Sequence, residues 1–184
     1  MTTNVTYENL LNFNNVESSK AGFALIPDGT IAKAHLTIRA GGAELDAYLT
    51  KSSNTGAVYL NAEFVILEGS FAKRKIFQNI GVVGAFREGD NDVFGTRGRS
   101  FLRSLIESAK NIYPTDNSEE AQKARKISGF AELDGLVCII KIGVDKDKSG
   151  KYADRNCVLC AITTDKKEYE QVMHGVQDDK NVWY

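Results

Sequence analysis

The fold follows from residues 58–68, which read Val58-Tyr59-Leu60-Asn61-Ala62-Glu63-Phe64-Val65-Ile66-Leu67-Glu68. Apolar and polar positions alternate with a period of two, which is typical of a strand that buries one face. One face holds Val58, Leu60, Ala62, Phe64 and Ile66, and the other holds Tyr59, Asn61, Glu63, Val65 and Leu67. The turn residues Gly69 and Ser70 follow, so residues 74–83 are expected to return as the next strand.

Similar patterns extend outward from this stretch. Strands are predicted at 30–39, weakly at 45–50, at 136–144 and at 155–163. A loop is predicted over 84–98, followed by a helix over about 100–113 with Thr96 or Ser100 as its cap, and short helices at 118–128 and 165–173. Runs of adjacent strands without βαβ units argue against a parallel α/β sheet.

The predicted fold class is therefore mainly β, a β-barrel with added helices. The order fits a five-stranded, Greek-key barrel like the oligonucleotide/oligosaccharide-binding (OB) fold, with a helix between strands 3 and 4. We expect an N-terminal arm at 1–22, the OB-fold domain at 23–165, and a C-terminal helix and tail at 166–184.

Composition limits the function. The 184 residues include 23 Lys and Arg against 24 Asp and Glu, a net charge of −1, which excludes proteins that coat nucleic acid by bulk positive charge. No apolar run approaches the roughly 20 residues of a membrane span, and no secretory leader is visible, so no membrane association is expected. Three cysteines cannot form a disulfide framework, which favours the cytoplasm.

Residues that could carry catalysis are sparse. There are two histidines, and the chain has no GxSxG, GxxxxGK[ST] or HExxH motif, so we expect no enzyme, no cofactor and no metal. Cys157 and Cys160 form a CxxC without a second ligand pair, and two buried strand cysteines explain them better than zinc. The segment 145–150 resembles a calcium loop only loosely, because Asn156 stands where the loop needs a glutamate.

Basic residues give the stronger signal. Between Ser70 and Lys110 there are eight Lys and Arg against four acids, with phenylalanines interleaved. Single-stranded nucleic acid is bound by this combination, because cations follow the phosphates while rings stack on bases. A solvated basic surface is the alternative explanation. The candidate binding residues are Tyr48, Tyr59, Lys73, Arg74, Lys75, Phe77, Arg97, Arg99 and Arg103.

Several short motifs resemble a known family. They are Ile26-Pro27-Asp28-Gly29-Thr30, the segments 59–64, 67–70 and 73–79, Leu133-Asp134-Gly135, and Asn156. Together they resemble small phage-encoded single-stranded-DNA-binding proteins with an OB fold, formerly a family of unknown function. The resemblance covers about residues 24–164.

The resemblance implies a protein that coats ssDNA in the host-cell cytoplasm during phage DNA replication or recombination, without catalysis. It places Lys73, Arg74, Lys75 and Phe77 on the binding face. It also implies a C-terminal tail that recruits replication or recombination proteins; here the tail ends in Trp183 and Tyr184 but holds few acids. The oligomeric state is open, with a homodimer as one candidate. The alternative hypothesis is an OB-like module that binds a host or replication protein.

Overall fold

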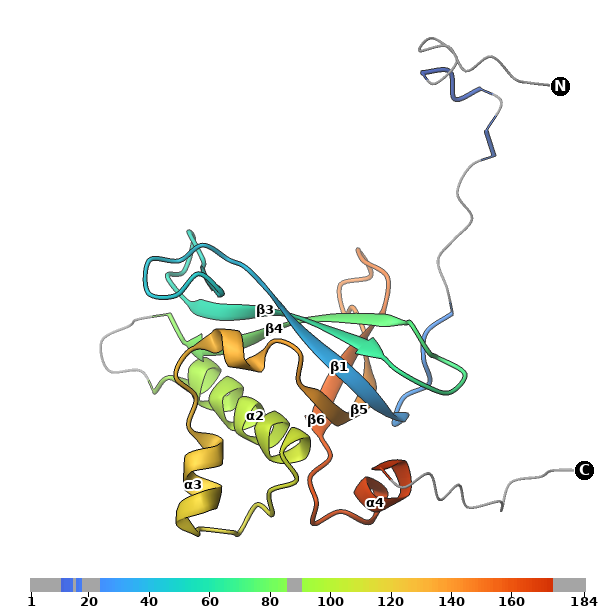
Figure 1. Cartoon of the computed structure of the whole chain (residues 1–184). Coiled ribbons are helices and arrows are strands. Elements are labelled where there is room, and N and C mark those ends of the chain that lie inside the picture. The colour runs from blue at the N-terminus through green and yellow to red at the C-terminus, as the bar shows by residue number, and fades with distance from the viewer. Residues whose placement is uncertain (1–10, 15, 18–23, 86–90, 174–184) are drawn as a thin grey trace, which may run out of the picture.

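The computed structural model describes residues 11–14, 16–17, 24–85 and 91–173 (Figure 1). Most of the predicted arm at 1–22 and residues 174–184 of the predicted tail lie outside these residues. The expected role of the tail in recruiting partners therefore stays a prediction.

Six strands of the described chain form one antiparallel sheet. In chain order they are β1 (Ile31–Arg39), β2 (Leu49–Lys51), β3 (Val58–Ile66), β4 (Lys75–Val83), β5 (Val137–Asp145) and β6 (Arg155–Ala161). The helices are α2 (Val93–Ala109), α3 (Glu119–Arg125), the 3-10 helix η1 (Phe130–Leu133) and α4 (Lys167–Met173). The mainly β class is confirmed, and α2 follows the third of the long strands, as the sequence predicted.

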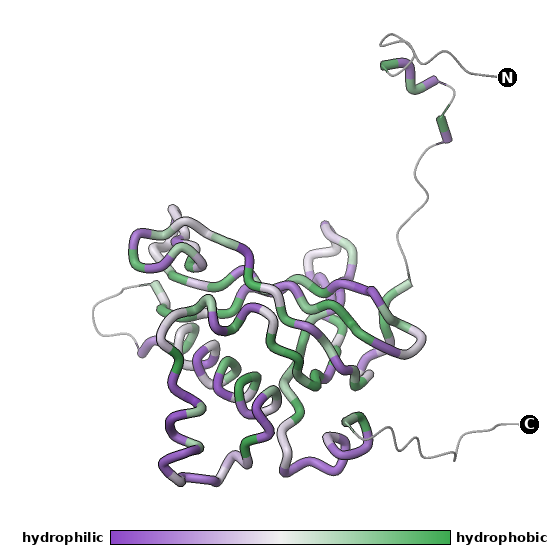
Figure 2. The backbone as a smooth tube through the Cα atoms, viewed as in Figure 1, coloured by the Kyte–Doolittle hydropathy of each residue, from purple (hydrophilic) through white to green (hydrophobic). Residues whose placement is uncertain are grey.

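Strand β3 lies at the centre of the pairing. Its residues 58–60 pair with β2 and its residues 61–66 with β1, so these two strands share one edge of β3, and β4 takes the other edge. The predicted alternation is confirmed, since Leu60 and Phe64 are fully buried. The Phe64 ring packs against Phe101 of α2, with the ring centroids 6.3 Å apart. The hydropathy pattern along the strands and α2 contrasts with the largely hydrophilic α3 (Figure 2).

The sheet is open, so the closed barrel that the sequence predicted is not confirmed. No backbone ladder joins β4 to β6 among the described residues. A side chain connects them instead, because Gln78 Oε1 accepts a hydrogen bond from Val158 N at 2.8 Å. Next to this point the β5–β6 register shifts so that Leu159 is an extra residue, and such a bulge interrupts regular pairing.

Helix α2 begins earlier than predicted. Asp92 caps it by accepting a hydrogen bond from the backbone N–H of Gly95 at 2.6 Å, so neither Thr96 nor Ser100 is the cap. Asp92 also accepts from Gly84 N, after β4, at 2.8 Å. Gly98, one of the glycines in the segment predicted as a loop, serves close packing against β4. A Cβ on Gly98 would lie 1.8 Å from the carbonyl oxygen of Gly81.

Helix α4, predicted to end at Met173, belongs to the packed structure. Tyr169 is buried with Ile139 and Ile162, and its hydroxyl donates to the carbonyl of Ser108 at 2.8 Å. The Ser108 hydroxyl in turn accepts from Ile139 N at 3.0 Å. One residue of α2 therefore anchors both β5 and α4.

The contact between Gly98 and Gly81 predicts the effect of a single methyl group. Gly98→Ala should lower the free energy of unfolding by about 1–3 kcal/mol, because α2 must move away from β4. Urea unfolding measures the loss. Ser100→Ala, on the exposed side of the same helix, is the matched control and should change stability by less than about 0.5 kcal/mol. Equal stability of the two variants would contradict the close packing of Gly98 against Gly81.

Candidate nucleic-acid interface

The polar side of β1, β3 and β4 is the candidate interface, and we call it the outer face. The strand register aligns its residues in rows, with Thr37 beside Glu63 and Glu63 beside Phe77, and with Arg39 beside Asn61 and Asn61 beside Asn79. Figure 1 shows the loops of residues 40–57 and the β5–β6 turn rising on the side of the sheet opposite α2. The outer face comprises Thr37, Arg39, Tyr59, Asn61, Glu63, Lys75, Phe77 and Asn79.

A buried carboxylate organises this face. Glu63 is 5% exposed, and its two oxygens bind Lys75 Nζ at 2.6 Å and the Arg39 guanidinium. These hydrogen bonds, first from Lys75 and then from Arg39, hold the pKa of Glu63 below its usual range. Both cations remain half exposed, so the acid lies inside the cluster and the positive groups face solvent.

Phe77 lies beside this cluster as an exposed aromatic ring. It is 54% exposed, and the Arg39 guanidinium carbon stands 4.9 Å from its ring centroid, a cation–π distance. Since Glu63 also binds Arg39, two contacts fix the position of the guanidinium: the ion pair with Glu63 and the cation–π contact with the Phe77 ring. The arrangement presents an exposed π surface with the Arg39 cation over the ring and Lys75 two positions away on the same strand.

The remaining predicted residues of this region lie nearby with different roles. Lys73 is exposed in the β3–β4 turn and has a positive φ of 67°. Arg74 donates to the carbonyl of Ala24 at 3.0 Å, which fixes the segment before β1. Tyr59 is half-buried on the outer face opposite Gly81, whereas Tyr48 packs against the core beside β2.

The three predicted arginines of α2 are not part of the outer face. Arg99 donates to the Val82 carbonyl and to Asp92 at 3.1 Å. Arg103 binds Glu107 at 2.8 Å, and Glu107 also holds Arg125 at 2.7 Å. Arg97 is exposed on the same helix. Although these arginines belong to the same basic stretch of the sequence as Lys73, they lie on a different surface of the molecule. Three further charged residues of that stretch, Arg87, Glu88 and Asp90, lie outside the described residues.

Sequence reasoning missed Arg39 and Glu63. Arg39 follows the polar alternation of β1, so the period-two pattern already placed it on the outer face. The pairing of β1 with β3 brings it to Glu63 and Phe77, and the sequence pattern alone does not specify that register.

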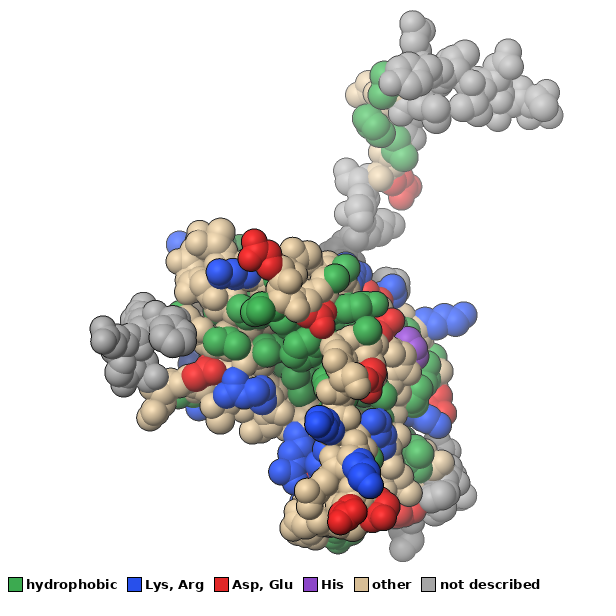
Figure 3. Space-filling view, turned by 60° about the vertical axis from the view of Figure 1, so that its left-hand side comes forward, with side chains coloured by type: hydrophobic (Ala, Val, Ile, Leu, Met, Phe, Trp, Pro, Cys, Tyr) green, Lys and Arg blue, Asp and Glu red, His purple; other side chains and the backbone are tan. Residues whose placement is uncertain are grey.

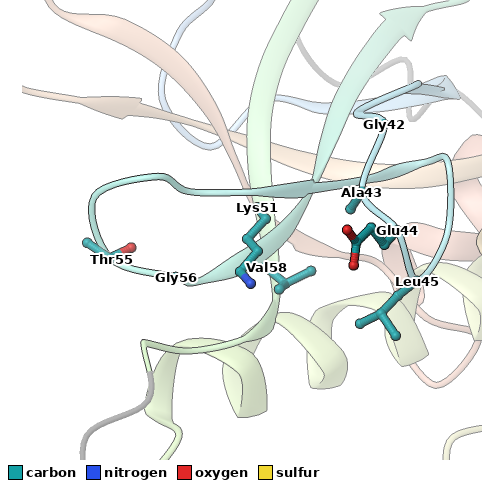
Figure 4. Close-up of a pocket in the computed structure, with 8 residues that line it drawn as sticks. All are labelled: Gly42, Ala43, Glu44, Leu45, Lys51, Thr55, Gly56 and Val58. Atoms are coloured by element: carbon teal, nitrogen blue, oxygen red, sulfur yellow. The ribbon is translucent and has the colours of Figure 1, made fainter.

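An open hollow of about 610 Å3 has none of the outer-face residues in its lining (Figure 4). It is formed by the loop before β2 and the β2–β3 turn, and Leu45 at its rim is 84% exposed. Figure 3 shows hydrophobic side chains gathered across the middle of one face of the molecule, with both basic and acidic side chains around them. The lining residues are Gly42, Ala43, Glu44, Leu45, Lys51, Thr55, Gly56 and Val58.

The three cysteines lie on β5 and β6. Burial raises the pKa of the Cys138 thiol to about 12. Cys157 is half-buried and Cys160 is exposed, so the expectation that both are buried in the core is wrong. The bulge at Leu159 turns this part of β6 out of the regular alternation. Within the described ranges, no three His, Cys, Asp or Glu side chains are close enough to hold a metal ion.

The motifs that resemble the phage family hold the strands together. Asn156 accepts from Ile26 N at 2.9 Å and donates to Ile26 O at 2.8 Å. Asp134 Oδ1 accepts from Ile38 N at 2.8 Å, and Gly29, with a φ of 84°, donates to Ile142 O at 2.8 Å. These residues therefore have structural roles away from the outer face.

Comparison with known proteins identified no matching family model and no matching curated protein. The resemblance to phage ssDNA-binding proteins thus depends on the quoted motifs alone. No helix in the described part of the chain is long and apolar enough to cross a membrane.

The lowered pKa of Glu63 predicts a pH-dependent contribution to stability. The carboxylate should add about 1–3 kcal/mol to the free energy of unfolding above about pH 4.5, where it is ionised in both the folded and the unfolded chain. As the pH falls through the lower folded-state pKa, this contribution should be lost.

Urea unfolding of the wild type and of Glu63→Gln between pH 3 and 8 measures this contribution. The stability difference between them should be full near pH 7 and should shrink in acid. Glu68→Gln, at an exposed position after β3, is the control and should show no such trend. A difference for Glu63→Gln that is constant across the range would contradict the ion cluster.

Proposed function

We propose that this protein binds single-stranded DNA through the outer face, without catalysis and without sequence specificity, in the host-cell cytoplasm during phage DNA replication or recombination. The observation that carries the proposal is Phe77, a half-exposed ring held beside the Arg39 guanidinium and flanked by Lys75. Exposed rings beside cations are the elements that bind single strands, because every base has a π face and every linkage has a phosphate.

We also propose that the open sheet is a variant of the OB fold. The strands pair in the order β4-β3-β1-β5-β6, and Gln78 brings β4 to β6 where the pairing would close a barrel. OB folds are partly open five-stranded barrels that bind oligonucleotides on their second and third strands. Here those strands correspond to β3 and β4, which carry Glu63, Lys75 and Phe77.

The geometry favours single strands over duplex DNA. A base can stack on Phe77 only when it has left its own stack, which is free in a single strand and costs energy in a duplex. Lys73 and Lys75 both precede Phe77, in the β3–β4 turn and at the start of β4, so a phosphate next to the stacked base would meet positive charge on that side. Glu63 neutralises one of the two cations beside the ring and keeps both in place.

Removing the ring tests the proposal directly. Phe77→Ala should weaken binding to a dT oligomer by about tenfold, since stacking contributes about 1–3 kcal/mol per base. Fluorescence anisotropy with labelled dT and with duplex DNA at two salt concentrations measures this loss. Tyr113→Ala, which removes an equally exposed ring beyond α2, should leave affinity unchanged, and Phe77→Trp should retain it.

Two results would overturn this assignment. The first is unchanged affinity of Phe77→Ala. The second is no binding of dT by the wild type at low salt, which would leave the protein-interaction module as the function to test by affinity capture.

The cation Lys73 predicts a change in salt dependence. Because Lys75 holds Glu63 and Arg74 holds Ala24, Lys73 is the residue of this basic run whose charge can be reversed without breaking a described contact. Lys73→Glu should make the slope of log Kobs against log salt less steep by about 0.7, the value for one phosphate contact on a single strand. The control is Lys123→Glu on α3, and an equal change in both variants would contradict a local contact.

A further inference from the structure

Strand β6 carries its two cysteines on the same side of the sheet, because the bulge changes its alternation. In a regular strand Cys157 and Cys160, three positions apart, would point to opposite faces. In β6 the two core residues are Val158 and Ala161, which are also three positions apart. The residues between them, Leu159 and Cys160, are both exposed. The extra residue of the bulge therefore turns Cys160 away from the core, onto the side that Cys157 faces.

The pairing with β5 shows how near the two cysteines are brought. Cys157 lies opposite Gly143, and Cys160 lies opposite Lys141. Gly143 and Lys141 are two residues apart on β5, so they share the face opposite to the buried Ile142 between them. The cysteines thus stand opposite positions that are two strand steps apart, about 7 Å, and not the roughly 10 Å that three regular steps would span.

Two contacts hold the bulge in this form. Gln78 of β4 accepts a hydrogen bond from Val158 N at 2.8 Å, on the residue directly before the bulge. On the other side, Leu159 lies over Gly143, where a Cβ would stand 2.6 Å from the leucine side chain. Because Gly143 has no side chain, Leu159 has room to lie there. The cysteine pair therefore belongs to a strand of defined form.

The pair fits a ligand that needs two sulfur atoms and no more. A disulfide brings its Cα atoms to within about 6.8 Å and its sulfurs to about 2 Å, a tighter approach than two same-face positions of a strand provide. Zinc takes four ligands, and within the described part of the chain no third His, Cys, Asp or Glu joins the pair. Cu(I) is a soft cation that thiolates select, and two sulfurs are sufficient to hold it.

We propose that Cys157 and Cys160 form a two-coordinate site for a soft monovalent metal ion, Cu(I). The ion displaces one proton from each thiol and forms two metal–sulfur bonds, with no change in oxidation state. Cys160 is exposed, which gives the ion a path from solvent to the pair. The site goes beyond the proposed function and is independent of it, since neither cysteine belongs to the outer face.

Titration of the reduced full chain with Cu(I) under anaerobic conditions, in competition with a chromogenic Cu(I) chelator, tests the site. The wild type should bind one Cu(I) per chain and show a thiolate-to-copper charge-transfer band. Cys157→Ser and Cys160→Ser should each weaken binding by more than about a hundredfold, because loss of a hydrogen-bond partner of a metal ligand already costs about 10–100-fold. Zn(II) should not be retained on gel filtration.

Cys138→Ala is the matched control, because it removes the buried cysteine of β5 and leaves the pair intact. Its Cu(I) affinity should equal that of the wild type. Circular dichroism shows whether each variant is folded, and the serine variants should be, because Cys160 is exposed and Cys157 is half-buried.

Three results would overturn the site. Wild-type affinity in Cys157→Ser would show that Cys160 binds copper as a single thiol. One Cu(I) shared by two chains, with a doubled mass in solution, would show a bridge between copies. Equal uptake by the wild type and by the variant that lacks both cysteines would show that neither is a ligand. Because DNA takes no part in the titration, copper binding without dT binding would overturn only the ssDNA proposal, and the reverse would overturn only this one.

Discussion

The buried carboxylate of Glu63 is the constraint on which the candidate interface depends. A carboxylate that is 5% exposed must be paired, since an unpaired buried charge costs several kcal/mol. Its partners come from the strands on both sides of β3, Arg39 from β1 and Lys75 from β4. One side chain therefore joins three strands, holds a guanidinium beside Phe77, and turns a polar sheet face into an ordered set of cations around a ring.

Most strands could be predicted from local sequence, and one helix boundary could not. The alternation in 58–66 specified β3 because a half-buried strand repeats every two residues. Gly95 and Gly98 suggested a loop, yet they lie in α2, where the absence of a Cβ on Gly98 lets the helix approach Gly81. A glycine selected for close packing has the same sequence signal as one selected for a turn, so only the partner surface distinguishes them.

The candidate site shows the same division between local and non-local information. Lys75 was predicted from the basic run at the start of a strand, and Phe77 from the aromatic residues interleaved with the basic ones; being two apart on β4, they share a face. Arg39 reaches them through the β1–β3 register, which connects residues 24 apart in sequence. Arg99 and Arg103 belong to the same basic stretch of the sequence as Lys75, but α2 uses them to bind Asp92 and Glu107.

The net charge of −1 does not show that some acidic side chains are buried while their basic partners are exposed. Glu63 and Glu107 are both buried, and each pairs with two cations, at least one of them largely exposed. Each cluster thus has one more positive than negative charge, with the acid inside and a positive group outside. Since a ligand meets the outer groups first, these surfaces are more positive than the sum over the chain suggests. Burial of acids beneath cations is how a nearly neutral protein can present a confined basic surface.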